Sequence, residues 1–209
     1  MKRLWDISPP LHTRSPVFPG DTPYSQVWGA TIGPGCPVNV SQITTSPHAG
    51  AHADAPLHYA QGAPTIGEVD LAPFLGPCRV IHAIDVGALV RPEHLAHAQA
   101  DLPPRGLVRT STHAGVDRWV VDFSAVSPET PERLADRGVR LVGIDTASVD
   151  PAASKTLDAH QVLRRRDLRV LENLVLDEVP EGDYELIALP LKLMEADASP
   201  VRAVLRELP

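Results

Sequence analysis

The chain has 209 residues, of which 43% are hydrophobic and 22% are charged, and these proportions are typical of a globular protein. We expect one domain over residues 1–209, because domains usually hold roughly 100–200 residues. The formal net charge of −7 argues against a nucleic-acid partner, since phosphate binding depends on clustered basic residues. No apolar run approaches the ~20 residues of a membrane span, so we expect no membrane association.

The two cysteines, Cys36 and Cys78, are far apart in the sequence and form no C-x-x-C pair. They predict neither a disulfide framework nor a thiolate zinc site. No apolar segment follows the first basic residues, so no signal peptide is expected. Together these features indicate a protein of the reducing cytoplasm.

The 22 prolines predict short elements, because proline interrupts both helices and strands. Apolar patterning and turn residues indicate the elements. In chain order we expect strands at 4–8, 24–30, 38–46 and 79–86, a short helix at 92–99, strands at 106–110 and 118–123, a helix at 130–137, a strand at 140–144, a helix at 155–166, and strands at 169–171, 185–193 and 201–208. Strands and helices are mixed without the regular alternation of a doubly wound parallel fold. The pattern therefore predicts an α/β or α+β domain.

The densest group of metal-binding residue types lies at residues 48–58, which read HAGAHADAPLH. His48 and His52 are four residues apart, as are Asp54 and His58, and most of the intervening residues are small. Such spacing lets several side chains converge, and imidazole with carboxylate is the ligand set expected for zinc, or less commonly manganese or iron. The alternative is a loop whose histidines only hydrogen-bond to the backbone. Three histidines and one aspartate so close together favour the metal site.

A metal site needs further ligands from elsewhere in the chain. Five other histidines fit surface, loop or satisfied core positions: His12, His82, His94, His97 and His113. His160 lies on a predicted helix, and Glu172 stands between apolar neighbours, where a carboxylate is costly to bury unless it is paired or bound to metal. From these local arguments alone His160 and Glu172 are candidates, and the remaining ligands stay open.

Residues 48–58 resemble the H-x-G-T-H-x-D-x-P-x-H motif of the metal-dependent cyclase hydrolases. Five other segments resemble the same family: WDIS (5–8), FPGD (18–21), GIDT (143–146), LENL (171–174) and LIALPLK (186–192). The resemblance therefore covers nearly the full chain. It implies a compact α/β domain with an antiparallel, β-barrel-like core flanked by helices, and an assembly of two or more copies, most simply a homodimer.

The resemblance also implies a metal centre with two zinc ions per subunit. His48, His52 and Asp54 would bind the first zinc ion. Asp54 and Glu172 would bridge to a second zinc ion held by His160. The family pattern thus extends the local argument, which left His160 and Glu172 as candidates only.

The reaction that the resemblance implies is the hydrolysis of N-formyl-L-kynurenine to L-kynurenine and formate in tryptophan degradation. His58 would be the general acid/base, and Phe18 falls where the family places an aromatic residue, usually Trp, against the substrate ring. The chain also has Ala51 where the wider family often has Thr. Ala51 lies between ligands, so this departure affects only local hydrogen bonding.

Two other functions stay open at the level of sequence. A cyclase-family hydrolase acting on a lactam or a different arylamide would share every ligand and differ only in its pocket. A metal-binding protein without catalysis is the second alternative. It would not need His58 beside the ligands, and for this reason we favour an enzyme.

Overall fold

The computed structural model describes residues 2–111, 113 and 115–208 of the chain. Its elements follow in this order: β1 (Leu4–Asp6), β2 (Ser25–Ala30), β3 (Val40–Thr44), β4 (His52–Asp54), α1 (Pro56–Tyr59), η1 (Ala72–Phe74), β5 (Leu75–His82), β6 (Leu89–Val90), η2 (Pro92–Ala98), β7 (Arg105–Arg109), β8 (Ala125–Val126), α2 (Glu129–Asp136), β9 (Leu141–Ile144), α3 (Asp158–Arg165), β10 (Arg169–Glu172), β11 (Gly182–Ile187), β12 (Ala198–Pro200) and β13 (Val204–Glu207). As the prolines predict, the elements are short, and the longest of the described helices, α2 and α3, have eight residues each. None of the helices in the described part of the chain has the length and apolarity to cross a membrane.

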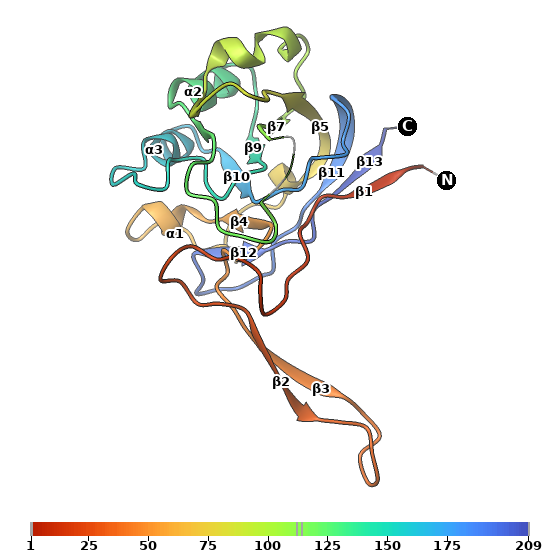
Figure 1. Ribbon diagram of the computed structural model, residues 1–209. Helices are drawn as coiled ribbons and strands as arrows, with labels where there is room; N and C mark the ends of the chain where they lie inside the picture. The colour runs from red at the N-terminus through yellow and green to blue at the C-terminus, as the bar shows by residue number, and fades with distance from the viewer. Residues whose placement is uncertain (1, 112, 114, 209) are drawn as a thin grey trace.

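Nine strands form one sheet in the order β1-β13-β11-β5-β7-β9-β10-β4-β12. The sheet curls into part of a barrel, with β1 and β13 toward one end and β4 and β12 at the other (Figure 1). This confirms the expected mixed α/β class with a barrel-like sheet and helices beside it. The expected antiparallel pairing holds on both flanks, whereas β5, β7, β9 and β10 are parallel. The parallel centre arises because η2, α2 and α3 lie in crossover connections, which return the chain in the same direction.

Neighbouring residues on the central strands pack on opposite faces of the sheet, as the two-residue period of a strand requires. Leu107 and Leu141 belong to one buried cluster, formed with residues from β5, β10, β11 and β13. The next residues, Val108 and Val142, belong to a second cluster that includes side chains of α2 and α3. Both faces of the central strands are therefore buried, which explains their nearly continuous apolar sequences.

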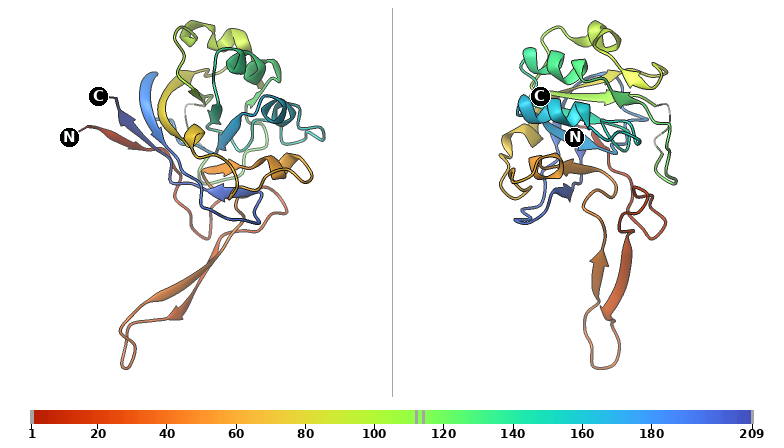
Figure 2. Two further views of the ribbon diagram at one scale, coloured as in Figure 1. Left: turned by 180° about the vertical axis from the view of Figure 1, so that it is seen from behind. Right: turned by 90° about the vertical axis from the view of Figure 1, so that its left-hand side faces the viewer.

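A long hairpin of β2, β3 and the turn between them, residues 25–44, projects from the rest of the molecule; we call it the arm. In Figures 1 and 2 it stands clear of the curled sheet from three directions. Among the described residues its strands pair only with each other, and nearly every strand residue is exposed. The exposed side chains include large apolar ones, among them Trp28 and Ile43.

The predicted strand at 118–123 is wrong, because these residues form bends and irregular backbone between β7 and β8. Their aromatic rings pack locally instead, with the centroids of Trp119 and Phe123 6.3 Å apart. β4, α1 and β12 escape prediction because each has only three or four residues. The segment 92–98 is a 3-10 helix, and the strand expected at 185–193 ends at Ile187, before Pro190.

Candidate metal centre and active site

The histidine motif meets α3 and β10 at one end of the sheet. His52 and Asp54 lie on β4 and are two residues apart, so their side chains share one face while Ala53 joins the core on the other. β4 pairs antiparallel with β10, and this register sets Glu172 directly opposite His52. The pairing of two segments that are distant in sequence thus brings the Glu172 carboxylate to the histidine motif. Local sequence reasoning alone left Glu172 as no more than a candidate metal ligand.

Three of the predicted ligands, His48, His52 and Asp54, form a first group. Nδ1 of His48 lies 3.0 Å from Oδ1 of Asp54. Nε2 of His52 lies 3.3 Å from the same oxygen and 3.3 Å from Oε2 of Glu172. Ligand atoms of His48, His52 and Asp54 all fall within 4.8 Å of one another, a spacing that one cation could bridge.

A second group consists of Asp54, His160 and Glu172, whose ligand atoms also fall within 4.8 Å of one another. Nε2 of His160 lies 3.3 Å from Oδ2 of Asp54 and 3.7 Å from Oε1 of Glu172. Asp54 therefore turns one oxygen toward each group, and so does Glu172. The geometry brings together all five residues that the resemblance names as metal ligands.

Two buried atoms in this cluster have no hydrogen-bond partner among the described residues: Nε2 of His52 and Oδ1 of Asp54. Both residues are only 1% exposed, and an unpaired buried polar atom is costly. Nitrogen and oxygen donors in this combination suit zinc. The residues present therefore fit a bound metal ion.

Carboxylates control protonation inside the cluster. Burial lowers the pKa of His52, but Asp54 and Glu172 outweigh this effect and raise the pKa to about 10. Burial likewise lowers the pKa of His160, whereas Asp150 and Asp54 raise it to about 10. Burial raises the pKa of Asp54, but the three histidines around it hold that pKa well below its usual range. Without a metal the histidines keep protons that a bound cation would displace.

Asp150, which the sequence reasoning missed, fixes the orientation of His160. Its Oδ2 accepts a hydrogen bond from Nδ1 of His160 at 2.6 Å and from the backbone N–H of His160 at 3.0 Å. Its Oδ1 accepts another from the backbone N–H of Ala159. These bonds hold the first turn of α3 and leave Nε2 of His160 directed at Asp54. No local pattern marks Asp150, because it precedes the helix by eight residues instead of standing at its start.

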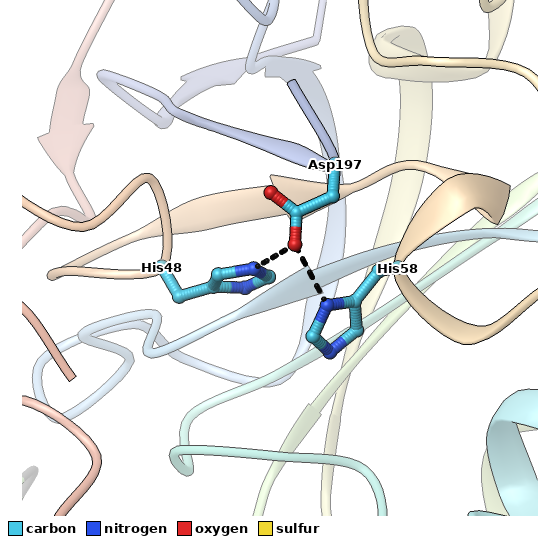
Figure 3. A group of neighbouring side chains, drawn as sticks. All are labelled: His48, His58 and Asp197. Atoms are coloured by element: carbon cyan, nitrogen blue, oxygen red, sulfur yellow. Dashed lines mark hydrogen bonds and ion pairs between the residues drawn. The ribbon is translucent and has the colours of Figure 1, made fainter. Parts of the chain in front are cut away.

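Asp197 is a second residue missed by sequence reasoning, and it joins His48 and His58 (Figure 3). Its Oδ2 lies 3.0 Å from Nε2 of His48 and 3.1 Å from Nδ1 of His58. His58 lies on α1 with its side chain 33% exposed, and its ring centroid is 4.3 Å from that of His48. His58, the predicted acid/base residue, therefore lies beside the first group of predicted ligands. It is also next to the carboxylate of Asp197, which lies near the C-terminal end of the sequence.

A cavity of about 730 Å³ opens beside these residues and is lined by His48, His58 and Glu172. Phe18 also lines it, and the centroids of Phe18 and Trp119 are 5.1 Å apart in an edge-to-face contact. Phe18 is 50% exposed, so part of this residue is accessible at the cavity that it lines. The residues at 118–123, wrongly predicted as a strand, thus contribute Trp119 to the cavity wall.

Three comparisons relate the chain to known proteins. The Cyclase family, described as "Putative cyclase", matches residues 5–151. A kynurenine formamidase from Bordetella pertussis is 72% identical over 208 residues, covering 100% of both chains, and one from Delftia acidovorans is 71% identical, covering 99% of both. A solved structure from Bacillus stearothermophilus, described as a predicted metal-dependent hydrolase, is 28% identical, has a TM-score of 0.83 and covers 100% of each chain.

The family match ends before His160 and Glu172, but the two kynurenine formamidases align with the chain through both positions. The resemblance inferred from the histidine motif is confirmed: the chain belongs to the cyclase family and is similar over its full length to kynurenine formamidases.

Proposed function

We propose that this enzyme hydrolyses N-formyl-L-kynurenine to L-kynurenine and formate, with two zinc ions per subunit. The main support for this reaction is the sequence identity of 72% to a kynurenine formamidase over the full chain. The metal requirement is supported by Nε2 of His52 and Oδ1 of Asp54, two buried atoms that lack a hydrogen-bond partner among the described residues. A lactam or another arylamide remains the alternative substrate, and the assay below separates the two.

His48, His52 and Asp54 would hold one zinc ion, and Asp54, His160 and Glu172 the other. When bound, zinc supplies a Lewis acid for the formyl oxygen and lowers the pKa of water toward ~7. Oε1 of Glu172 also accepts a hydrogen bond from the backbone N–H of Val149 at 2.7 Å. This bond fixes its carboxylate in the position from which both groups can share it.

His58 acts as general acid/base in this proposal. Water adds to the formyl carbon, the bond from that carbon to the aryl nitrogen breaks, and the nitrogen must gain a proton to leave as an amine. An imidazole can accept a proton from water and return it to the leaving nitrogen near neutral pH. Its partly exposed position at the cavity lets it reach a bound substrate.

Phe18 and Trp119 would bind the aromatic ring of the substrate. Edge-to-face and offset contacts between rings are worth about 0.5–1.5 kcal/mol beyond simple burial. A pair of aromatic side chains already in contact on the cavity wall suits an aryl formamide better than an aliphatic amide.

We also propose a homodimer in the cytoplasm. The arm supports the dimer, because a two-stranded hairpin alone in water is marginally stable and this one exposes several large apolar side chains. Free Cys36 and Cys78 support a reducing compartment.

The test is the loss of N-formylkynurenine, followed by absorbance, with purified zinc-loaded protein and a chelated control. Turnover that disappears with the chelator and returns with zinc is the expected result. If protein with bound zinc does not turn over N-formylkynurenine but does open a lactam or cleave another arylamide, the substrate assignment fails while the metal assignment stands. Turnover that survives complete zinc removal contradicts the metal assignment.

A further inference from the structure

We propose that Asp197 is a positioning residue for the reaction: it fixes the tautomer and orientation of His58 and ties that residue to the metal ligand His48. This inference rests on the proposed function of the site. The contact that carries it is a single carboxylate oxygen shared by two imidazole rings (Figure 3).

The donor and acceptor roles follow from the chemistry of the groups. An ionised carboxylate can only accept hydrogen bonds, so both ring nitrogens that face Oδ2 of Asp197 must donate. His58 then carries its proton on Nδ1, and its Nε2 is the atom free to take and return the catalytic proton. This is the role that a carboxylate plays toward the histidine of a hydrolytic triad, where it sets the tautomer of the base.

The same oxygen acts on His48. Nε2 of His48 donates to Asp197 at 3.0 Å, which leaves Nδ1, 3.0 Å from Asp54, as the nitrogen that faces the first metal group. A histidine ligand usually donates its second N–H to such an outer acceptor. Asp197 therefore couples the orientation of a metal ligand to that of the acid/base.

His58 needs such a partner because its own element holds it weakly. α1 has four residues, and the His58 side chain is one-third exposed. Within the described part of the chain, Asp197 provides the one polar contact of this ring. Its other ring contacts are aromatic, with His48, Tyr59 and His160.

Asp197, by contrast, is well anchored by its backbone. Its carbonyl accepts a hydrogen bond from the N–H of Ala55 at 2.8 Å. The next residue, Ala198, begins β12 and pairs with Asp54 on β4. The strand that carries His52 and Asp54 thus also sets the position of Asp197, so the metal ligands and the acid/base share one rigid frame.

The kinetic test compares Asp197→Asn with Glu195→Gln, a charge-neutralising control at an exposed carboxylate in the same segment, both at saturating zinc. We expect kcat for N-formylkynurenine to fall about 10–100-fold in Asp197→Asn, as for other outer-sphere partners, with KM and zinc content little changed. Glu195→Gln should match the wild type. An unchanged kcat in Asp197→Asn overturns the inference.

Two further measurements separate positioning from a structural role. In the double variant with His58→Ala, the Asp197→Asn change should add no further loss, because residues that act as a unit are non-additive. With an aryl formate ester, whose phenolate leaves without a proton, the loss should shrink to within about 3-fold, since the general acid contributes little to that step. Losses that multiply in the double variant, or an equal loss with the ester, contradict the proposal.

A spectroscopic measurement does not depend on turnover. Nitrogen-15 NMR of the zinc-loaded wild type, at a pH where His58 is neutral, should show its proton on Nδ1, and Asp197→Ala should lose this preference. A proton on Nε2 in the wild type overturns the inference whatever the substrate is. If the tautomer is as expected and N-formylkynurenine is not hydrolysed, the proposed function fails and the role of Asp197 toward His58 stands.

Discussion

Asp54 and His58 lie four residues apart in the same motif, yet their positions assign them different tasks. Asp54 is 1% exposed and turns one oxygen to each ligand group. His58 lies at the cavity and contacts neither Asp54 nor Glu172 through a hydrogen bond or ion pair among the described residues. Substitutions at the two positions should therefore impair the enzyme in different ways, one through the reaction rate and the other through metal binding.

His58→Ala should keep its zinc and lose kcat by about 10²–10⁴-fold, the contribution typical of general acid/base catalysis. Asp54→Ala should lose zinc itself, because both groups lose a ligand at once. Metal content by mass spectrometry, measured beside the rate, separates the two effects. Full activity in His58→Ala, or unchanged zinc in Asp54→Ala, contradicts these assignments.

The buried histidines also predict a pH dependence of the metal-free protein. The pKa values of His52 and His160 are raised to about 10, above their unfolded values of ~6.5. A raised pKa stabilises the folded state fully below the unfolded value, and this stabilisation is lost as pH rises toward the folded value. The Tm of chelated protein should therefore fall as pH rises from about 6.5 toward about 10.

Zinc-loaded protein is the control for this pH series, because the metal takes the place of those protons and the decline should be much weaker. Thermal unfolding from about pH 6 to about pH 9 measures both forms. A Tm of the chelated protein that rises through this range would show that the buried imidazoles are neutral without metal.

The sequence predicts the residues of the motif but not those that orient them. Residues 48–58 are recognisable because four functional positions stand close together in the chain. Asp150 and Asp197 act on His160 and His58 through the fold, from a loop before α3 and from the residue just before β12. An isolated aspartate in a loop is common, so nothing in its neighbours indicates its partner.

At the scale of elements, β7, β9 and the segment after β10 pack so closely that Gly143 has no room for a side chain. A Cβ added to Gly143 would lie 2.5 Å from Cδ2 of Leu107 and 2.9 Å from Cδ1 of Leu174, and both leucines are fully buried. Gly106 on the adjacent strand β7 provides a comparison, because a Cβ there meets nothing within 4 Å. The two glycines therefore differ in the space around them.

Gly143→Ala should destabilise the protein by about 1–3 kcal/mol, the usual cost of overpacking a core. Gly106→Ala, in the same sheet, should change stability by no more than about 0.5 kcal/mol. Denaturant unfolding of the zinc-loaded proteins measures both. Equal effects of the two substitutions would show that β7 and β9 are not packed as described.

Strands are predicted correctly from sequence where both of their faces are buried. The prediction fails where tertiary contacts determine whether a segment forms a strand. The strand expected at 140–144 is present as β9 because its apolar run suits the centre of a sheet. Residues 118–123 have a similar run, but they pair with no strand in the part of the chain that the structure describes, and Trp119 packs on Phe18 instead. The short strand β4 is invisible to periodicity, since its pairing with β10 and β12 alone defines it.

At the scale of the whole molecule, nothing in a single chain explains why the arm exposes large apolar side chains. Trp28 and Ile43 project from one face of the hairpin, since Trp28 pairs with Ser41 and Gln26 with Ile43. They are 59% and 56% exposed. Exposed apolar groups on an unsupported hairpin favour association, so the proposed dimer should depend on them.

Replacing Trp28 and Ile43 by Ser should convert dimer to monomer, or raise the dimer dissociation constant by at least about tenfold. Gln26→Ser, on the same face of the same strand, is the matched control. Light scattering over a range of protein concentrations measures the change. A dimer of unaltered strength in the double variant would show that the arm does not hold it together.

The central claim, a zinc-dependent hydrolase with two shared-ligand groups, is tested most directly by adding zinc in steps to the metal-free protein while following N-formylkynurenine hydrolysis. The rate should rise from zero and stop rising at about two zinc ions per chain, because Asp54 and Glu172 serve both groups. A rate that is complete at one zinc ion, or that never appears although two are bound, would contradict the account.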